Sequence, residues 1–235
     1  MSKGLKGVVA AQTALSLVDG ENGILLYRGE HARDLALTKS FEEVAYFIWH
    51  QNWPNREELQ KLKTQFKQEH ALPEHVQTIL NALPQNTSIM SALRTAISSL
   101  GTEEYGWKPT LGQAATLTAL TPTIISYWYR KQKGEEFVPP RDDLDFVANY
   151  LYMLNGEAPK PAHVRALEAY MILTMEHGFN ASTFSARVTA STESDMISAI
   201  TAAIGTMKGP LHGGAPSGVI EMLEEIGSIE KADQW

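Results

Sequence analysis

The chain has 235 residues, of which 43% are apolar and 20% are charged, a composition typical of ordinary globular proteins. A net charge of −7 argues against a nucleic-acid partner, because binding a phosphate backbone needs concentrated Lys and Arg. The absence of cysteine excludes disulfides, thiolate metal sites and a cysteine nucleophile. No apolar run reaches the roughly 18 residues of a membrane span. The N-terminus also lacks the apolar core of a secretion signal, so we expect a cytoplasmic protein without a membrane partner.

The first thirty residues differ from the rest of the chain. Two apolar runs, 8–11 and 24–27, flank the turn-rich segment 19–23. This pattern predicts a short extended pair at the N-terminus.

Nearly everything after this segment has the pattern of helices, so the expected fold class is all-α. Ser40 precedes Glu43 at the spacing of a capping box, and Asn55 is the expected N-cap of a following helix. Pro73 and Pro84 bracket a further helix. The other helices expected in this part of the chain cover residues 56–68, 91–100, 111–131 and 142–155.

The last third carries a first histidine at the end of a helical pattern. Pro161 suits the first turn of a helix, which we expect to run to His177, with Gly178 in the left-handed position beyond it. The helix dipole would then favour a protonated imidazole that donates hydrogen bonds to a carboxylate. Asn180 and Ser182 offer further donors. The alternative is a histidine that only caps the helix end.

A second histidine follows the next helical pattern. This helix is expected to begin at Ser194 or Asp195 and to end at Met207. His212 then lies in a glycine-rich turn before a new helix, and the amide of Gly213 lies near that helix start, where the dipole attracts negative charge. A neutral imidazole there can act as a weak acid towards a carbonyl oxygen. The alternative is a loop histidine without a role.

Other kinds of site are poorly supported. His177 and His212 could both bind zinc, but no Asp, Glu or Cys partner has ligand spacing, so no metal site is predicted. Ser182 lacks a nucleophile elbow, and the chain has no glycine-rich phosphate-binding motif.

Several motifs together resemble citrate synthase in the compact bacterial form that includes 2-methylcitrate synthases. The match covers essentially the whole chain, and it rests on segments 4–8, 18–21, 27–29 and 40–46 together with the segments around His177 and His212. The resemblance implies a helical protein with a large and a small domain, forming a homodimer or a higher homo-oligomer. It implies the condensation of acetyl-CoA with oxaloacetate. No cofactor is implied, since acetyl-CoA is a substrate.

The resemblance also implies roles for individual residues. His212 corresponds to the residue that donates to the thioester carbonyl as the enol forms, an electrostatic task of the oxyanion-hole type. His177 corresponds to the oxaloacetate-binding histidine, and Asn180 supports it. Ser182 and Gly213 correspond to positions that orient His212, and an orienting partner decides which imidazole nitrogen carries the proton.

By resemblance, residues 1–212 belong to the large domain and residues 213–235 begin the small one, with its first helix at 216–227. Helices 91–100 and 111–131 resemble helices that pack across the dimer. The family's catalytic aspartate, a third histidine and the substrate-binding arginines lie beyond residue 235. We therefore expect an incomplete chain that is inactive alone, because removal of the methyl proton needs a positioned base.

Two alternatives remain open at this point. The same kind of enzyme could use propionyl-CoA and make 2-methylcitrate. A reading of another class is a non-catalytic remnant that only dimerises.

Overall fold

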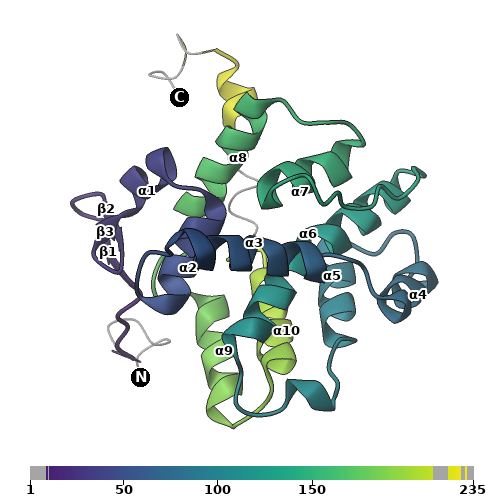
Figure 1. Cartoon of the computed structure of the whole chain (residues 1–235), viewed down its shortest axis with the longest axis horizontal. Helices are drawn as coiled ribbons and strands as arrows, with labels where there is room; N and C mark the ends of the chain where they lie inside the picture. The colour runs from purple at the N-terminus through teal and green to yellow at the C-terminus, as the bar shows by residue number, and fades with distance from the viewer. Residues whose placement is uncertain (1–8, 10, 214–221, 229–230, 232–235) are drawn as a thin grey trace. The chain divides into compact units, whose positions relative to one another are not determined.

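The computed structural model describes residues 9, 11–213, 222–228 and 231, and it divides into two compact units. Unit 1 comprises residues 1–81 and 110–180, and unit 2 comprises residues 82–109 and 181–235, each as far as it is described. Apart from one small sheet, the regular structure is helical, which confirms the all-α class (Figure 1). The expected domain boundary at 212/213 stays a prediction, since residues 214–221 lie outside the described part.

The sheet of unit 1 has three short antiparallel strands in the order β1-β2-β3. Strand β1 covers Ser16–Asp19, β2 covers Ile24–Tyr27 and β3 covers Glu30–His31. The predicted second strand is confirmed, and its partner is the strand 16–19. Of the expected first strand 8–11, residues 8 and 10 lie outside the described residues, and Val9 and Ala11 are not in a strand. Asp19 pairs with Ile24 and accepts a hydrogen bond from the amide of Asn22 at 3.1 Å. The strand that pairs with β2 is therefore formed by residues 16–19, which directly precede the turn.

Local capping explains where three helices of unit 1 begin. Ser40 and Asn55 each form a capping box, as predicted, and Thr110 forms a third that was not predicted. Three of the helices are α1 (Ala32–Thr38), α2 (Phe41–His50) and α3 (Arg56–Glu69). The others are α4 (Glu74–Ala82, which reaches the unit boundary), α6 (Leu111–Gln132), α7 (Phe146–Asn155) and α8 (Pro161–Leu173).

Helix α7 begins at Phe146, four residues later than the expected start at 142. The side chain of Asn149 accepts a hydrogen bond from the Arg141 amide at 3.0 Å and donates to the Arg141 carbonyl at 2.8 Å. This two-way contact keeps the segment before α7 folded back on the helix, so it cannot continue the helical path. A sequence pattern does not reveal such a contact.

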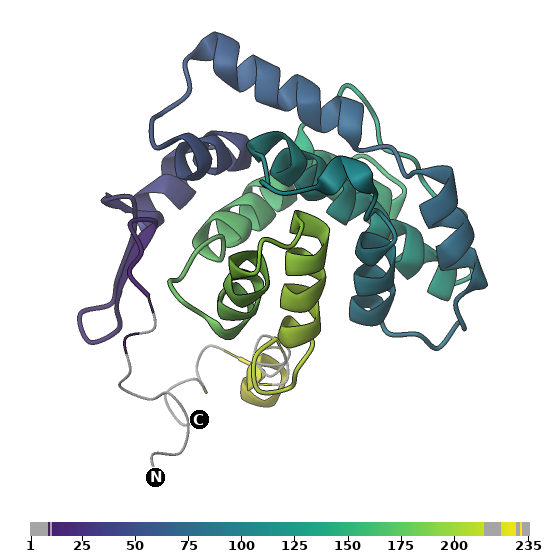
Figure 2. The same ribbon diagram turned by 90° about the horizontal axis from the view of Figure 1, so that it is seen from below.

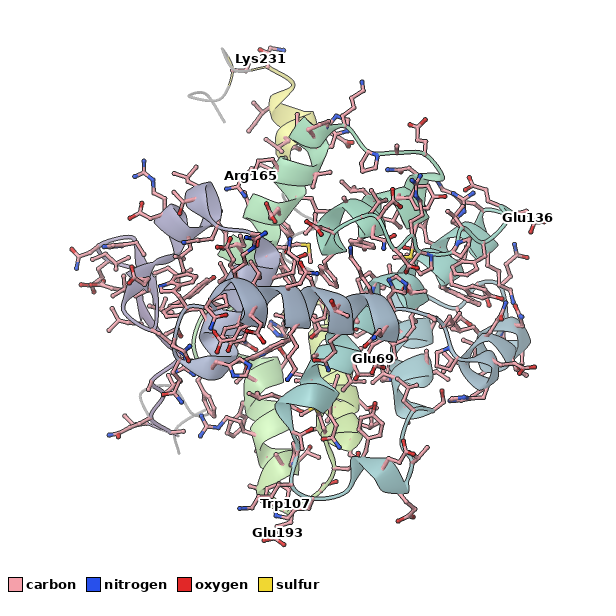
Figure 3. The ribbon with its side chains drawn as sticks, viewed as in Figure 1. Glu69, Trp107, Glu136, Arg165, Glu193 and Lys231 are labelled. Carbon is pink, nitrogen blue, oxygen red and sulfur yellow. The ribbon has the colours of Figure 1, made fainter. Side chains whose placement is uncertain are left out.

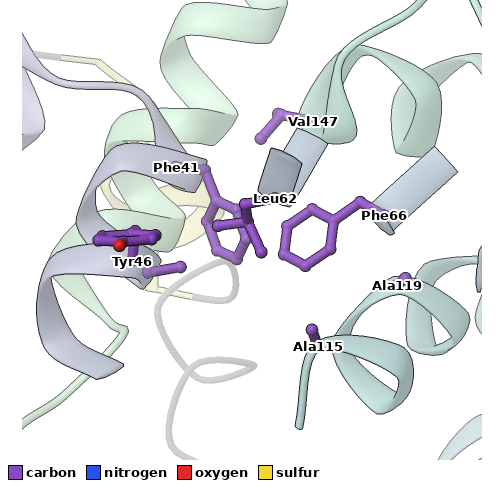
Figure 4. Close-up of a cluster of buried hydrophobic side chains, with 8 residues drawn as sticks. Phe41, Tyr46, Leu62, Phe66, Ala115, Ala119 and Val147 are labelled. Carbon is purple, nitrogen blue, oxygen red and sulfur yellow. The ribbon is translucent and has the colours of Figure 1, made fainter. Parts of the chain in front are cut away.

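An apolar cluster joins four helices of unit 1. It contains Phe41, Ala45, Tyr46, Leu62, Phe66, Ala115, Ala119 and Val147, all at most 8% exposed (Figure 4). The rings of Phe41 and Phe146 stack with their centroids 4.5 Å apart. A second cluster packs β2 and α1 against α2 and α8 through Tyr27, Ala32, Leu35, Ala36, Val44 and Ile172. The two clusters thus fix α8, which leads to the first candidate histidine.

A polar network ties α8 to the junction of α1 and α2. Arg165, which Figure 3 labels, donates to the carbonyls of Ala36 and Lys39 and to Glu168. Glu168 in turn accepts from the Phe41 amide at 2.9 Å. A cation therefore meets the carboxyl end of α1 and a carboxylate meets the amino end of α2, as both helix dipoles favour.

Glu42 is a buried carboxyl group in the core of unit 1, only 2% exposed. It accepts a hydrogen bond at 3.2 Å from the amide of Phe146, the first residue of α7. Burial raises the pKa of Glu42 above its ordinary value of 4.5, although the hydrogen bonds to backbone amides and the charge of Lys63 oppose the shift.

This raised pKa predicts how stability depends on pH. The pKa of Glu42 is 4.5 in the unfolded chain and higher in the folded chain, so the folded chain binds this proton more tightly. The contribution of Glu42 to the free energy of unfolding is therefore fully present below pH 4.5, and it falls as the pH rises through the pKa of the folded chain. Glu42→Gln keeps an acceptor for the Phe146 amide and removes the titration. We expect the variant to be more stable than the wild type at pH 8, with a difference that shrinks towards pH 5. Urea unfolding of both proteins between pH 5 and pH 8 measures this difference in stability. A difference that does not change with pH would contradict the prediction.

The described part of unit 2 is built around three helices and one short 3-10 turn. These are α5 (Ile89–Ser98), η1 (Glu103–Tyr105), α9 (Ala181–Ser191) and α10 (Met196–Met207). Helix α10 packs against both α9 and α5 (Figure 2). Asp195 is its N-cap and accepts from the Ser198 amide at 2.8 Å, which confirms one of the two predicted caps.

Helix α9 was not expected, because its run of Ser, Thr and Ala shows no clear apolar period. Hydroxyl side chains compete for backbone hydrogen bonds and favour caps and turns. Packing against α10 supplies the stabilisation that the local sequence lacks. Of the expected helix over 216–227, residues 222–226 are helical and its beginning lies outside the described residues. No helix within the described residues is both long enough and apolar enough to cross a membrane.

Candidate functional site

His212 lies in a tight turn that folds back on the end of α10. The His212 amide donates to the Gly209 carbonyl at 3.0 Å, and the Gly213 amide donates to the Met207 carbonyl at 3.0 Å. These bonds satisfy backbone groups at the helix end, where the helix itself offers no partner. The imidazole of His212 is half-buried. The backbone around the side chain is therefore held on both sides.

Gly213 is a position where no side chain fits. A Cβ atom there would lie 2.1 Å from the Met207 carbonyl oxygen and 3.1 Å from the Met207 Cγ atom. The turn can approach α10 this closely only because residue 213 is glycine. The orienting role assigned to Gly213 stays a prediction, and the close approach is a physical reason for it.

Ser182 and His212, thirty residues apart, meet within unit 2. Ser182 Oγ lies 2.9 Å from His212 Nε2, and Ser182 is only 6% exposed in the first turn of α9. The tautomer decides which atom donates in this contact. In either case Nε2 is the ring nitrogen that contacts the serine. This geometry supports the orienting role of Ser182, which stays a prediction.

His177 and Asn180 lie in a loop of unit 1, and the expected helix end at His177 is wrong. Helix α8 ends at Leu173, so His177 is four residues beyond it and its side chain is exposed. The reason is tertiary. The hydroxyl of Tyr27 lies 2.8 Å from the Ile172 carbonyl and 3.0 Å from the Leu173 carbonyl, and it takes the place of the next helical turn.

Gly178 does adopt a left-handed conformation, with φ of +84°, but within the loop rather than as the cap of α8. The Asn180 amide donates to the Gly178 carbonyl at 3.0 Å. His177 is not at the end of α8, so the predicted placement of its imidazole at the negative end of the α8 dipole is wrong. The binding roles of His177 and Asn180 stay predictions.

The sequence reasoning missed the residues that hold this loop. The Oε1 atom of Glu176 accepts from the Gly178 amide at 2.6 Å and from Ser16 Oγ at 2.8 Å. The apolar run 24–27 could have signalled a buried tyrosine, but nothing in the sequence indicates its partners. Among the described residues, no group of three or more His, Asp or Glu side chains could hold a metal ion.

Comparison with known families decides what kind of protein carries these residues. The family profile described as "Citrate synthase, C-terminal domain" matches residues 4–235. The chain belongs to the citrate synthase family. Citrate synthase of Mycolicibacterium smegmatis is 43% identical to it over 99% of this chain and 63% of the relative. A 2-methylcitrate synthase of Mycobacterium tuberculosis is 41% identical over 100% of this chain and 61% of the relative.

A solved citrate synthase has the same fold. The enzyme of Thermoplasma acidophilum, in a ternary complex with carboxymethyl coenzyme A and oxaloacetate, superimposes with a TM-score of 0.88 at 28% identity, over 97% of this chain and 61% of that chain. The chain therefore spans about three-fifths of the length of the relatives that it matches.

Proposed function

We propose that this chain supplies the enol-stabilising and oxaloacetate-binding residues of a citrate synthase, which condenses acetyl-CoA with oxaloacetate to give citrate and CoA. The observation that carries the proposal is the contact of 2.9 Å between Ser182 Oγ and His212 Nε2 in a chain of this family. In this role Ser182 and Gly213 orient the imidazole and leave Nδ1 of His212 to donate to the thioester carbonyl. The relative in complex with a CoA analogue and oxaloacetate supports these two substrates.

The chemistry asked of His212 is stabilisation of developing negative charge. As the methyl proton leaves acetyl-CoA, charge gathers on the thioester oxygen, and a donor held in place beforehand stabilises it without reorganisation. His177 and Asn180 would donate to the carboxylate or carbonyl oxygens of oxaloacetate. Acetyl-CoA acts as a substrate, and no cofactor is needed. We also propose that the protein forms a homodimer or a higher homo-oligomer and works in the cytoplasm.

The 235-residue polypeptide by itself is expected to turn over at the background rate. By resemblance, the family's catalytic base has no counterpart among residues 1–235, and proton abstraction requires one. We therefore define two fusion enzymes. In each of them this chain is followed by the C-terminal portion of a relative, namely the part of that relative that this chain does not match. One takes that portion from the M. smegmatis citrate synthase, and the other from the M. tuberculosis 2-methylcitrate synthase.

The two fusion enzymes test the choice of acyl-CoA. Relatives at 43% and 41% identity carry the names citrate synthase and 2-methylcitrate synthase, so the second activity has support of its own. One methylene in an apolar pocket is worth roughly 10–200-fold in kcat/KM. We expect a preference for acetyl-CoA over propionyl-CoA in both fusions, measured as oxaloacetate-dependent CoA release. A preference for propionyl-CoA in both fusions would favour the 2-methylcitrate synthase reading.

Two further outcomes complete this test. A preference that follows the attached portion contradicts the expected preference for acetyl-CoA in both fusions and would mean that the attached portion sets the choice of acyl group. Absence of activity in both fusions, with folding shown by circular dichroism, would contradict the proposed function.

A further inference from the structure

We propose that the N-terminal hairpin positions the first candidate histidine: Ser16, Tyr27 and Glu176 hold the loop of residues 174–180 in one conformation and thereby present His177 to its ligand. The identity of that ligand rests on the proposed function. The hydrogen bonds that hold the loop do not depend on it. The three residues act through the backbone beside His177, so they are positioning residues rather than catalytic ones.

The first anchor is the hydroxyl of Tyr27, a residue that is 0% exposed. It shares its proton between the carbonyls of Ile172 and Leu173, at 2.8 and 3.0 Å, and accepts a longer contact of 3.4 Å from the amide of Glu176. The Ile172 carbonyl also accepts from the Met175 amide at 3.2 Å, and the Tyr27 hydroxyl links it to the carbonyl of Leu173, the last residue of α8. The hydroxyl thus fixes both where the helix stops and where the loop begins.

The second anchor is the carboxylate of Glu176 on the other side of the loop. Its Oε1 atom accepts from the Gly178 amide at 2.6 Å and from Ser16 Oγ at 2.8 Å. Hydrogen bonds to an ionised acceptor are roughly twice as strong as neutral ones. Gly178 has φ of +84°, and a Cβ atom there would lie 3.4 Å from Val18 Cγ2. The loop therefore lies directly against strand β1.

The two anchors come from one place in the sheet. Ser16 and Tyr27 are cross-strand partners in the β1–β2 ladder, and directly opposed residues of an antiparallel pair point to the same face. One hairpin therefore contacts the backbone before His177, at residues 172, 173 and 176, and after it, through Glu176 to residue 178. The His177 side chain itself is exposed. A loop ordered in advance loses less entropy when a ligand binds.

The test uses the whole 235-residue chain and NMR spectroscopy. It measures hydrogen exchange of the Gly178 amide and the imidazole resonances of His177. In Glu176→Ala, which removes the acceptor of both hydrogen bonds, the Gly178 amide is expected to exchange roughly 10- to 100-fold faster, on the scale of a hydrogen bond to a charged group. The His177 resonances are expected to move in the same variant. Glu176→Gln retains an acceptor oxygen, so its Gly178 amide exchange rate and its His177 resonances should both remain close to those of the wild type. Glu157→Ala, an exposed glutamate between α7 and α8, is the matched control and should change neither.

Ser16→Ala keeps the proposal falsifiable if Glu176→Ala does not fold. It removes a single hydroxyl donor and should move the His177 resonances in the same direction by a smaller amount. The proposal is overturned if Glu176→Ala keeps the wild-type Gly178 exchange rate and the wild-type His177 resonances. If only Ser16→Ala folds, the same result in that variant overturns it.

Titration of each folded variant with oxaloacetate separates this proposal from the proposed function. We expect oxaloacetate to move the His177 resonances of the wild type, and to do so at higher concentration in Glu176→Ala. If oxaloacetate leaves the wild-type resonances unchanged while Glu176→Ala still alters Gly178 exchange, the positioning role stands and the proposed ligand is wrong. If oxaloacetate acts equally on wild type and Glu176→Ala, the ligand stands and the positioning role is overturned.

Discussion

His212→Ala is expected to lower kcat of the M. smegmatis fusion enzyme by about 10²–10³-fold, the usual cost of removing one donor that stabilises a developing oxyanion. The KM for oxaloacetate should change much less, because this interaction forms mainly in the transition state. The imidazole is half-buried, and Ser182 Oγ holds it at 2.9 Å. Steady-state CoA release measures both constants.

The controls for this experiment use the same contact. Ser182→Ala should lose less activity than His212→Ala, because the serine acts only through the imidazole. For the same reason, adding Ser182→Ala to His212→Ala should cause no further loss, since residues that act as a unit are strongly non-additive. His163→Ala, an exposed histidine of α8, should retain the wild-type rate. A wild-type kcat in His212→Ala would remove His212 from the mechanism.

Trp128→Ala is expected to destabilise unit 1 by about 3–5 kcal/mol, the range measured for truncating a large buried aromatic residue. Trp128 lies in α6 and is 0% exposed, and it has the largest side chain among the fully buried residues that the structure describes. A loss of this size is a large fraction of the 5–15 kcal/mol by which a typical domain is stable. Urea unfolding followed by circular dichroism at 222 nm measures the change without relying on tryptophan fluorescence.

The matched control for Trp128 is another tryptophan. Trp107, labelled in Figure 3, is 47% exposed, so Trp107→Ala should change the free energy of unfolding by about 0.5 kcal/mol or less. Equal losses in the two variants would contradict the assignment of Trp128 to the core.

The helix starts were largely predictable, because a cap is a local event. Ser40 and Glu43, Asn55 and Glu58, and Asp195 and Ser198 each lie three residues apart, and every one of these pairs forms the expected cap. The histidine motifs, too, could be recognised from their glycine-rich surroundings, and together with the segments 4–8, 18–21, 27–29 and 40–46 they indicated the family.

What the sequence by itself determined is therefore the helical class, most helix starts, the family and the two candidate histidines, since all of these depend on neighbours along the chain. The tertiary structure alone decided where α8 stops, because the Tyr27 hydroxyl that ends it lies 145 positions away in the sequence. It also decided that α9 forms, that Glu176 turns inwards to Ser16, and that Ser182 reaches His212. Each of these depends on a contact between distant segments, and local propensity contains no information about which distant partner will arrive.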